Sequence, residues 1–178
     1  MTNTVSCPLP ENINPLSPNG FSFTILKIPS VNFFCQQANL PGLSFGEPEF
    51  ANPFRSVPIP GDIITYDTLQ IQFLVDEQMS NYKAIHNWIV ALGFPTSYEE
   101  YTSFIGTDTT SLSISELAKN YSDATLEILG VNNLAVQTVQ FIDVFPVALE
   151  SVLFQSTNQD VPYIVGNATF RYSYYKFI

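Results

Sequence analysis

The sequence is poor in the residues that usually carry chemistry. It has one histidine, His86, and no Ser or Cys nucleophile pattern accompanies it, so a surface or packing role suits it better than general-base catalysis. With only eight glycines, it has no glycine-rich phosphate loop. Two cysteines, Cys7 and Cys35, are too few for a disulfide scaffold and show no metal-ligand spacing. We therefore expect free, buried thiols, no enzyme, no cofactor and no metal site.

Positive charge is also scarce. Six Lys and Arg residues stand against 16 Asp and Glu, for a net charge of −10, and the basic residues are scattered singly. Binding to nucleic acid or to an anionic membrane depends on clustered cations, so both roles are disfavoured. The acidity either keeps the protein soluble or repels DNA. No apolar run approaches the roughly 20 residues of a membrane helix, and no signal peptide is visible, so we expect no membrane insertion and synthesis in a cytoplasm.

Aromatic residues are abundant by contrast. The 178 residues include 15 Phe and nine Tyr; 46% of the chain is hydrophobic and only 12% is charged. This length fits one domain, residues 1–178, with a real core. The aromatic residues indicate either an aromatic-rich β core or interfaces between subunits, where aromatics are enriched.

Two segments of the chain lack hydrophobic periodicity. Residues 1–20 contain four prolines and predict an extended N-terminal arm, because proline neither continues a helix nor donates to a sheet. Residues 96–120 are rich in Ser and Thr and predict a long insertion, with a short helical turn at Ser113–Lys119. Leu43–Pro60 carries a further four prolines, which favours an edge hairpin or a long ordered loop ending at Gly61-Asp62.

The remaining segments alternate apolar and polar residues. We predict one helix, Ser80–Leu92, with Tyr82, Ile85 and Ile89 on its core face beside Trp88, and with Asp76, Glu77 or Ser80 as its cap. Successive strands joined by short turns predict a mainly β fold, with two packed antiparallel sheets as a sandwich or barrel and this helix flanking them. The predicted strands are Phe21–Ile28, Val31–Gln37, Tyr66–Val75, Ala124–Leu129, Val136–Phe145, Val147–Phe154 and Ala168–Phe177.

Pairs of neighbouring carboxylates raise the possibility of a glycosidase. A glycosidase needs two carboxyl groups about 5 to 10 Å apart across a sugar site, and closeness in sequence does not create that cleft. A carbohydrate-binding β-sandwich stays open as an alternative that would use exposed Tyr and Phe as stacking platforms. The carboxylate pairs are Glu47/Glu49, Asp76/Glu77 and Glu99/Glu100.

The order of these segments resembles the tail tube proteins of contractile-tailed bacteriophages. The resemblance runs from about Phe21 to Phe177. It rests on Ala38–Gly42, on Pro60-Gly61-Asp62, on the strand Tyr66–Val75 running into Asp76-Glu77, on the helix with Trp88, on Leu126–Gly130, on Val144–Pro146 and on Phe170–Tyr175.

The resemblance implies a structural virion protein. Six copies would close into a ring, and stacked rings would form a tube through which DNA passes without specific binding. Sheath and baseplate proteins would be partners, and the protein would belong to the virion tail after assembly in the host cytoplasm. The extra segments 1–20 and 96–120 leave open a tube-initiating or baseplate-hub role.

The resemblance also assigns residues to positions in the tube. Leu43–Val57 and Tyr66–Val75 would supply the inner strands, and the helix around Trp88 would face a neighbouring subunit or the sheath. The residues expected to face the lumen are Glu47, Glu49, Gln70 and Gln72; those expected between subunits are Pro60, Gly61, Asp62 and Trp88.

Overall fold

The computed structural model describes residues 16, 18–32, 34–51, 53–93, 99, 120–155 and 163–178. Most of two predicted segments lies outside these residues: the N-terminal extension 1–20, with Cys7, and the insertion 96–120, with the helical turn at Ser113–Lys119. The elements in chain order are β1 (Phe21–Ile25), α1 (Pro29–Asn32), β2 (Cys35–Ala38), β3 (Leu43–Phe45), β4 (Glu49–Ala51), β5 (Ser56–Pro58), β6 (Ile64–Tyr66), β7 (Leu69–Leu74), α2 (Ser80–Gly93), β8 (Ser122–Leu129), β9 (Ala135–Leu149), β10 (Val165–Arg171) and β11 (Tyr174–Phe177).

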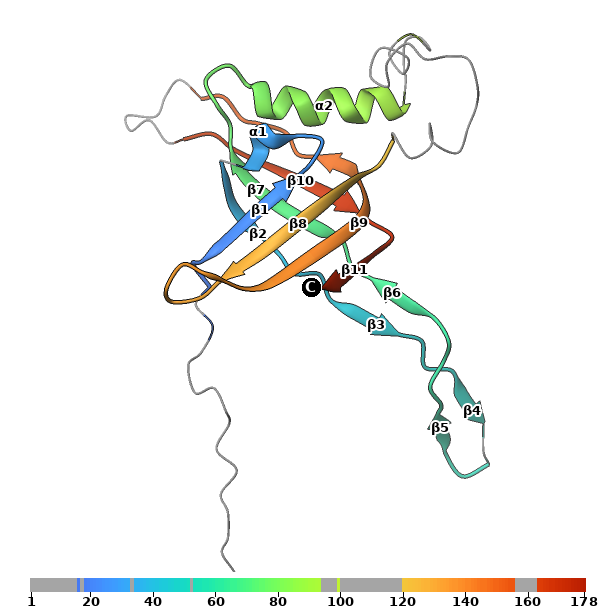
Figure 1. Cartoon of the computed structure of the whole chain (residues 1–178). Coiled ribbons are helices and arrows are strands. Elements are labelled where there is room, and N and C mark those ends of the chain that lie inside the picture. Colours follow the sequence, from blue (N-terminus) through green and yellow to red (C-terminus); the bar gives the residue numbers. More distant parts are fainter. Residues whose placement is uncertain are drawn as a thin grey trace, which may run out of the picture.

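The body of the molecule is one antiparallel sheet that folds over on itself. Its strand order is β1-β8-β9-β10-β7-β2, and β11 is paired with β9. The β1-β8-β9 half lies over the β10-β7-β2 half, with helix α2 across one end (Figure 1). The predicted mainly β fold of packed antiparallel sheets with one flanking helix is confirmed. The described strands do not close into a barrel.

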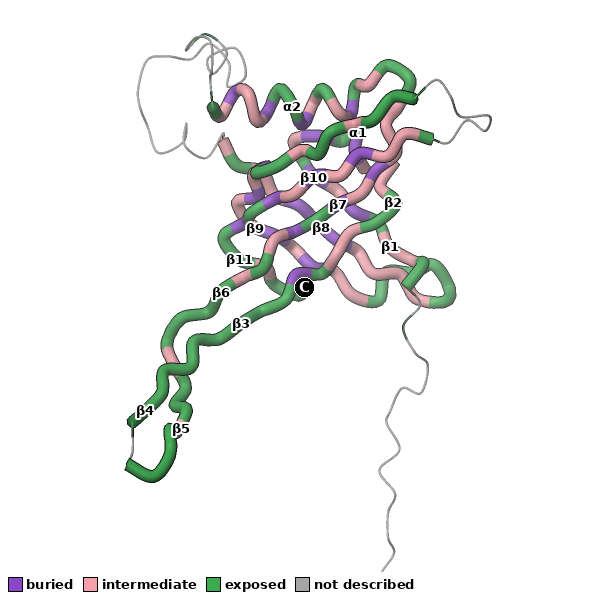
Figure 2. The backbone as a smooth tube through the Cα atoms, turned by 180° about the vertical axis from the view of Figure 1, so that it is seen from behind, coloured by how far each residue is buried: buried purple, intermediate pink, exposed green. Residues whose placement is uncertain are grey.

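The core lies between the two halves of this sheet and extends under α2. Side chains that alternate along each strand are buried, as in β7, where Leu69, Ile71 and Phe73 point inward. Trp88 of α2 is fully buried and tilts against Phe170, with ring centroids 6.3 Å apart. Buried positions are purple in Figure 2, where they follow the body strands and one side of α2.

Helix α2 forms where the sequence predicts it. The Asp76 carboxylate accepts a hydrogen bond of 2.6 Å from the backbone N–H of Ser80, and a second from the Ser80 hydroxyl. These bonds cap the first turn and hold the pKa of Asp76 below its usual value. Asn81 is fully buried, and its amide donates a hydrogen bond to the Leu74 carbonyl, which offsets the cost of burying a polar side chain. Asp76 is therefore the cap among the three candidates.

Two predicted strand boundaries at the C-terminal end are wrong. Strand β9 runs through Pro146 to Leu149, whereas the sequence suggested two strands separated at this proline. Pro146 is tolerated because the register with β10 shifts beside it, between Thr169 and Phe170, and a proline is accepted at such a bulge. The single strand predicted over 168–177 is divided into β10 and β11, which pair with successive parts of β9.

Two other boundaries also differ from the predictions. Pro29–Asn32 forms helix α1, so β2 starts only at Cys35. The strand predicted from Tyr66 to Val75 is interrupted at residues 67 and 68, between β6 and β7. At this break the Asn39 side chain accepts a hydrogen bond from the Gln70 amide at 2.6 Å and donates one to the Thr68 carbonyl at 3.1 Å.

Candidate functional site

A long two-stranded ribbon, here called the arm (residues 42–66), leaves the body and points away from it (Figure 1). Near the body, β3 pairs with β6; farther out, β4 pairs with β5. The segment predicted as an edge hairpin or ordered loop is therefore a hairpin. It pairs with itself and does not extend the main sheet.

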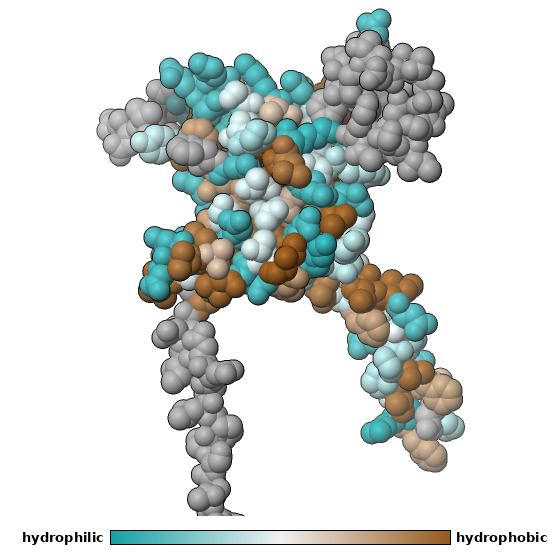
Figure 3. Space-filling view, in the orientation of Figure 1, coloured by the Kyte–Doolittle hydropathy of each residue, from teal (hydrophilic) through white to brown (hydrophobic). Residues whose placement is uncertain are grey.

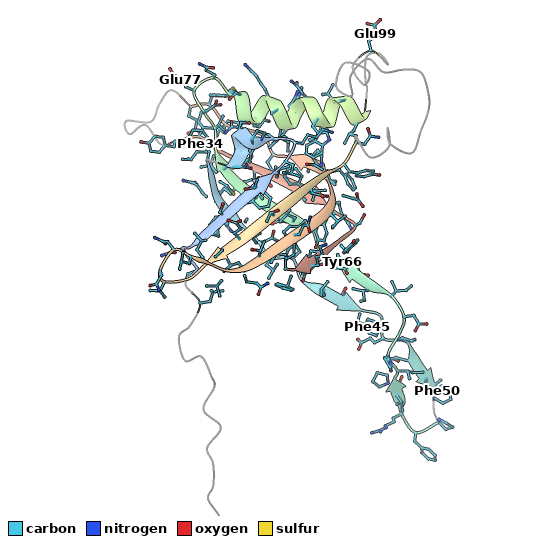
Figure 4. The ribbon with its side chains drawn as sticks, in the orientation of Figure 1. Phe34, Phe45, Phe50, Tyr66, Glu77 and Glu99 are labelled. Carbon is cyan, nitrogen blue, oxygen red and sulfur yellow. The ribbon has the colours of Figure 1, made fainter. Side chains whose placement is uncertain are left out.

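One side of the arm near the body is apolar. The register places Leu43 opposite Tyr66 and Phe45 opposite Ile64, while the facing pair Ser44 and Thr65 occupies the other side. Leu43, Phe45 and Ile64 are each more than half exposed. Phe50, opposite Val57, continues the exposed apolar surface outward (Figures 3 and 4).

The predicted turn Pro60-Gly61-Asp62 lies along the arm, whereas the hairpin reverses between β4 and β5. The Gly61 amide donates to the Gly46 carbonyl at 2.7 Å, and the Ile59 amide donates to Pro48 at 2.9 Å. A Cβ at Gly61 would lie 2.5 Å from the Gly46 oxygen, so only glycine permits this close approach. These bonds join the inner and outer parts of the arm.

The arm is fixed to the body by an aromatic cluster that the sequence analysis did not single out. Tyr66 packs edge-on against Tyr172 and Tyr175, with centroids 5.9 and 5.8 Å apart. The Tyr175 hydroxyl donates to the Pro41 carbonyl at 3.2 Å. Burial raises the pKa of Tyr172 to about 12, which keeps its hydroxyl protonated. The only available signal was the presence of three tyrosines within residues 172–175.

The outward face of the β2-β7-β10 half is rich in amides. Gln70 and Gln72 of β7 lie on it, opposite Thr169 and Asn167 of β10, and Gln37 of β2 pairs beside Gln72. A shallow hollow of about 210 Å³ follows this row. The carboxylate lining this hollow is that of Glu150, which accepts a hydrogen bond of 2.7 Å from Asn167. The polar face is thus largely uncharged.

A larger hollow of about 410 Å³ lies where the arm meets this face. Arg171, exposed at the end of β10, contributes its cationic side chain to it. Asp67 contributes a carboxylate, so the hollow contains both signs of charge. Its lining residues are Asn39, Thr65, Tyr66, Asp67, Thr68, Gln70 and Arg171.

The structure places the four predicted lumen residues in two regions. Gln70 and Gln72 share the polar face of β7, whereas Glu47 and Glu49 are exposed on the arm. Glu49 accepts a hydrogen bond of 2.6 Å from Ser56 across the arm. The sequence did not distinguish these regions, because it did not show that the arm leaves the sheet.

Trp88 is not available as a contact between subunits in this conformation. It has no exposed surface, and its indole N–H donates to the Asn120 carbonyl at 3.1 Å. The Lys27 ammonium lies 5.1 Å from the centre of its ring, and burial lowers the pKa of Lys27. Trp88 lies on the buried face of α2 with Ile85, so a neighbouring subunit can reach only the outer residues of the helix, such as the exposed His86.

Within the described ranges, no group of three or more His, Cys, Asp or Glu side chains is arranged to hold a metal ion. None of the described helices is both long and apolar enough to cross a membrane. The hollows are lined mainly by amide, hydroxyl and charged side chains. Only Tyr66 adds an aromatic ring to either lining, so neither hollow provides the aromatic groove expected of a sugar-binding sandwich.

Residues 5–178 match the family model described as phage tail tube protein. A comparison with curated protein sequences found no match. The fold is similar to a chain in the cryo-EM structure of the anti-feeding prophage baseplate, with a TM-score of 0.61 and 12% identity over 93% of this chain and 96% of that chain. It is also similar to a chain in the anti-feeding prophage tube-terminating cap, with a TM-score of 0.59 and 13% identity over 98% of each chain. A chain in the sheath–tube complex of an extracellular contractile injection system gives a TM-score of 0.55 and 13% identity, over 92% of this chain and 91% of that chain.

Proposed function

Because this chain belongs to the phage tail tube protein family, we propose that six copies close into a ring and that stacked rings form the tube of a phage or phage-like tail. The protein is a tail tube-like structural protein, as its sequence suggested. The hexameric ring, the stacking and the passage of DNA are the proposed part. Sheath and baseplate proteins are its proposed partners, and assembly in the host cytoplasm is the proposed route.

The arm is the observation that carries the proposal. A two-stranded ribbon is marginally stable in water on its own, and this one exposes a series of large apolar side chains. Phe54 is 96% exposed, Ile63 73% and Phe50 62%. Exposed apolar surface of this kind indicates a contact with another chain. Copies of the same protein supply that contact in a homo-oligomeric tube. Pro60, Gly61 and Asp62 would then lie within the contact, as parts of the arm.

The polar face of the β2-β7-β10 half is the proposed wall of the channel. Its amides and hydroxyls offer hydrogen bonds, and Arg171 at its edge is the one cation among the residues that line its hollows. DNA would therefore gain little affinity from released counterions there. Gln70 and Gln72 would face the lumen at the centre of this wall. Glu47 and Glu49 would add negative charge to the lumen only where the arm of some copy reaches it.

A tube-initiating or baseplate position is a second candidate. The similarity of the fold to a baseplate chain, over nearly the full length of both, makes this position worth testing. The two positions differ in stoichiometry: a tube subunit self-assembles into long tubes, whereas an initiating subunit stops at single rings. Image analysis of the purified protein distinguishes them.

Sedimentation velocity and negative-stain microscopy over a range of protein concentrations test the proposal. We expect rings, or rings stacked into tubes, with sixfold views along the axis. Phe50→Ser should shift the distribution toward monomer, whereas Leu26→Ser, which changes a side chain that is 72% exposed on the body, serves as the matched control. A wild-type chain that remains monomeric at high concentration would contradict the proposed function.

A further inference from the structure

We propose that the arm of one copy docks on the β10–β11 end of a second copy, where its carboxylates face Arg171 and Lys176. This inference rests on the proposed self-assembly and identifies the surface that receives the arm. Three features of the described residues support it: the distribution of cations, the charge of the arm, and the apolar surface around β11.

Two of the four cations on the described body are exposed on the successive strands β10 and β11. Arg171 is exposed at the end of β10, and Lys176 is exposed on β11, five residues later. The other described cations lie elsewhere: Lys27 sits over the Trp88 ring, and Lys83 lies on α2, where its ammonium donates to the Gln78 carbonyl. The β10–β11 end is thus the part of the described body where two exposed cations lie along one continuous segment.

The arm carries the opposite charge. Glu47, Glu49 and Asp62 are acidic and exposed, against one cation, Arg55, near the outer end. The hydrogen bond from Ser56 holds the Glu49 carboxylate on the arm. Each copy has a net charge of −10, so contacts between copies are repulsive unless a cation of one faces an anion of the other. The β10–β11 end, with two exposed cations, is therefore a surface that an acidic arm can approach.

Apolar surface accompanies these cations. Tyr174 shares its face of β11 with Lys176, because both side chains lie two residues apart on one strand. Tyr174 is 45% exposed, and Ile178, just past the strand, is 69% exposed. Phe177 lies on the other face, where it packs against Tyr175. The exposed Phe45, Phe50 and Ile64 of an arm provide matching apolar surface, so the contact would have an apolar centre and charged flanks.

The receiving surface also has an open sheet edge and a hollow. Within the described residues β11 pairs with β9 alone, so its other edge can accept a strand. The hollow beside Arg171, of about 410 Å³, is large enough to admit a carboxylate side chain. Asp67 also lines this hollow and would repel a second carboxylate. The charge of Arg171 is therefore needed to offset that repulsion.

The arm of the same chain cannot fill this role. It starts beside β11 and extends away from the body, so its acidic part lies far from its own β10–β11 end (Figure 1). A second copy presents both the arm and the receiving surface. The contact is therefore directional, with the arm of each copy on the body of the next, as closed rings or stacks require.

Charge reversal tests the pairing. We expect Glu47→Lys with Glu49→Lys to weaken self-association by about tenfold or more, since opposite charges become like charges. Arg171→Glu with Lys176→Glu should do the same. Mixing these two variants, or combining all four substitutions in one chain, should restore assembly, because each charge again faces its opposite. Lys83→Glu and Glu77→Lys, which change exposed charges away from both surfaces, are the matched controls.

The outcomes separate this inference from the proposed function. Far-ultraviolet circular dichroism and the unfolding midpoint of each variant confirm that it is folded. If the wild type assembles and the reversals have no more effect than the controls, the arm docks elsewhere and the inference is overturned. Loss of assembly without recovery in the mixture or the fourfold variant also overturns it. A wild type that never self-associates refutes the proposed function itself.

Discussion

The Gly61 amide and the Gly46 carbonyl oxygen form a 2.7 Å hydrogen bond across the arm. The two strands approach so closely that a Cβ at Gly61 would lie 2.5 Å from that oxygen and 3.1 Å from the ring of Pro48. The arm therefore depends on a glycine at this position for the alignment of β3–β6 with β4–β5. It is joined to the body separately, through Tyr66.

Gly61→Ala should distort the arm and leave the body intact. We expect self-association to fall sharply, because the outer arm can no longer keep its register, while the free energy of unfolding of the body changes little. Sedimentation velocity and thermal unfolding measured on the same samples check both parts. Gly93→Ala is the control, since a Cβ there meets no atom within 4 Å. A Gly61→Ala protein that assembles normally would show that the close approach is not needed.

Trp88→Ala should lower the free energy of unfolding by about 3–5 kcal/mol, the usual cost of truncating a buried Trp. The change removes the packing against Phe170 and leaves the Asn120 carbonyl without its indole donor. Urea unfolding followed by circular dichroism measures it. Val131→Ala, at a position 79% exposed in the β8–β9 turn, should change the free energy by less than about 0.5 kcal/mol. A loss below about 1 kcal/mol for Trp88→Ala would contradict the role of Trp88 in the core.

Asp76→Ala should destabilise the protein at neutral pH and lose its effect in acid. The hydrogen bonds from Ser80 hold the pKa of Asp76 below its usual value, so the carboxylate stabilises the fold above the ordinary aspartate pKa of about 3.9. That contribution disappears as pH falls through the lowered pKa. Unfolding midpoints of wild type and variant between pH 7 and pH 2 should converge at the acid end. Glu77→Ala, at the adjacent exposed acid, is the matched control.

The sequence predicted elements whose pattern is set locally. The alternation of β7 and the helical period of α2 each follow from neighbouring residues. Contacts distant in sequence decided the rest. Pro146 remains inside β9 because β9 bulges beside it at Val147, where the register with β10 shifts. Asn39 binds residues 68 and 70 at the point where β6 gives way to β7.

The candidate site was less predictable for the same reason. Alternation alone assigns Gln70 and Gln72 to the outward face of β7. The separation of Glu47 and Glu49 from that face depends on the course of the arm, which is fixed by Tyr66 packing on two tyrosines more than 100 residues later. No local pattern in Leu43–Pro60 indicates whether such a hairpin joins the sheet or leaves it.

Cys35 should make the protein less stable in alkaline solution. Burial raises the pKa of its thiol to about 11, well above the ordinary value of about 8.5, so the folded state favours the neutral thiol. The resulting stabilisation is complete below about pH 8.5 and is lost as pH rises toward 11. Unfolding midpoints from pH 7 to 11 should therefore fall more steeply for wild type than for Cys35→Ala. In a Cys7→Ser background, Cys35 should also react with iodoacetamide at pH 8.5 more slowly than a peptide thiol, because less of it is thiolate. Equal reaction rates, or parallel pH profiles for wild type and Cys35→Ala, would show that Cys35 is not protected in the fold.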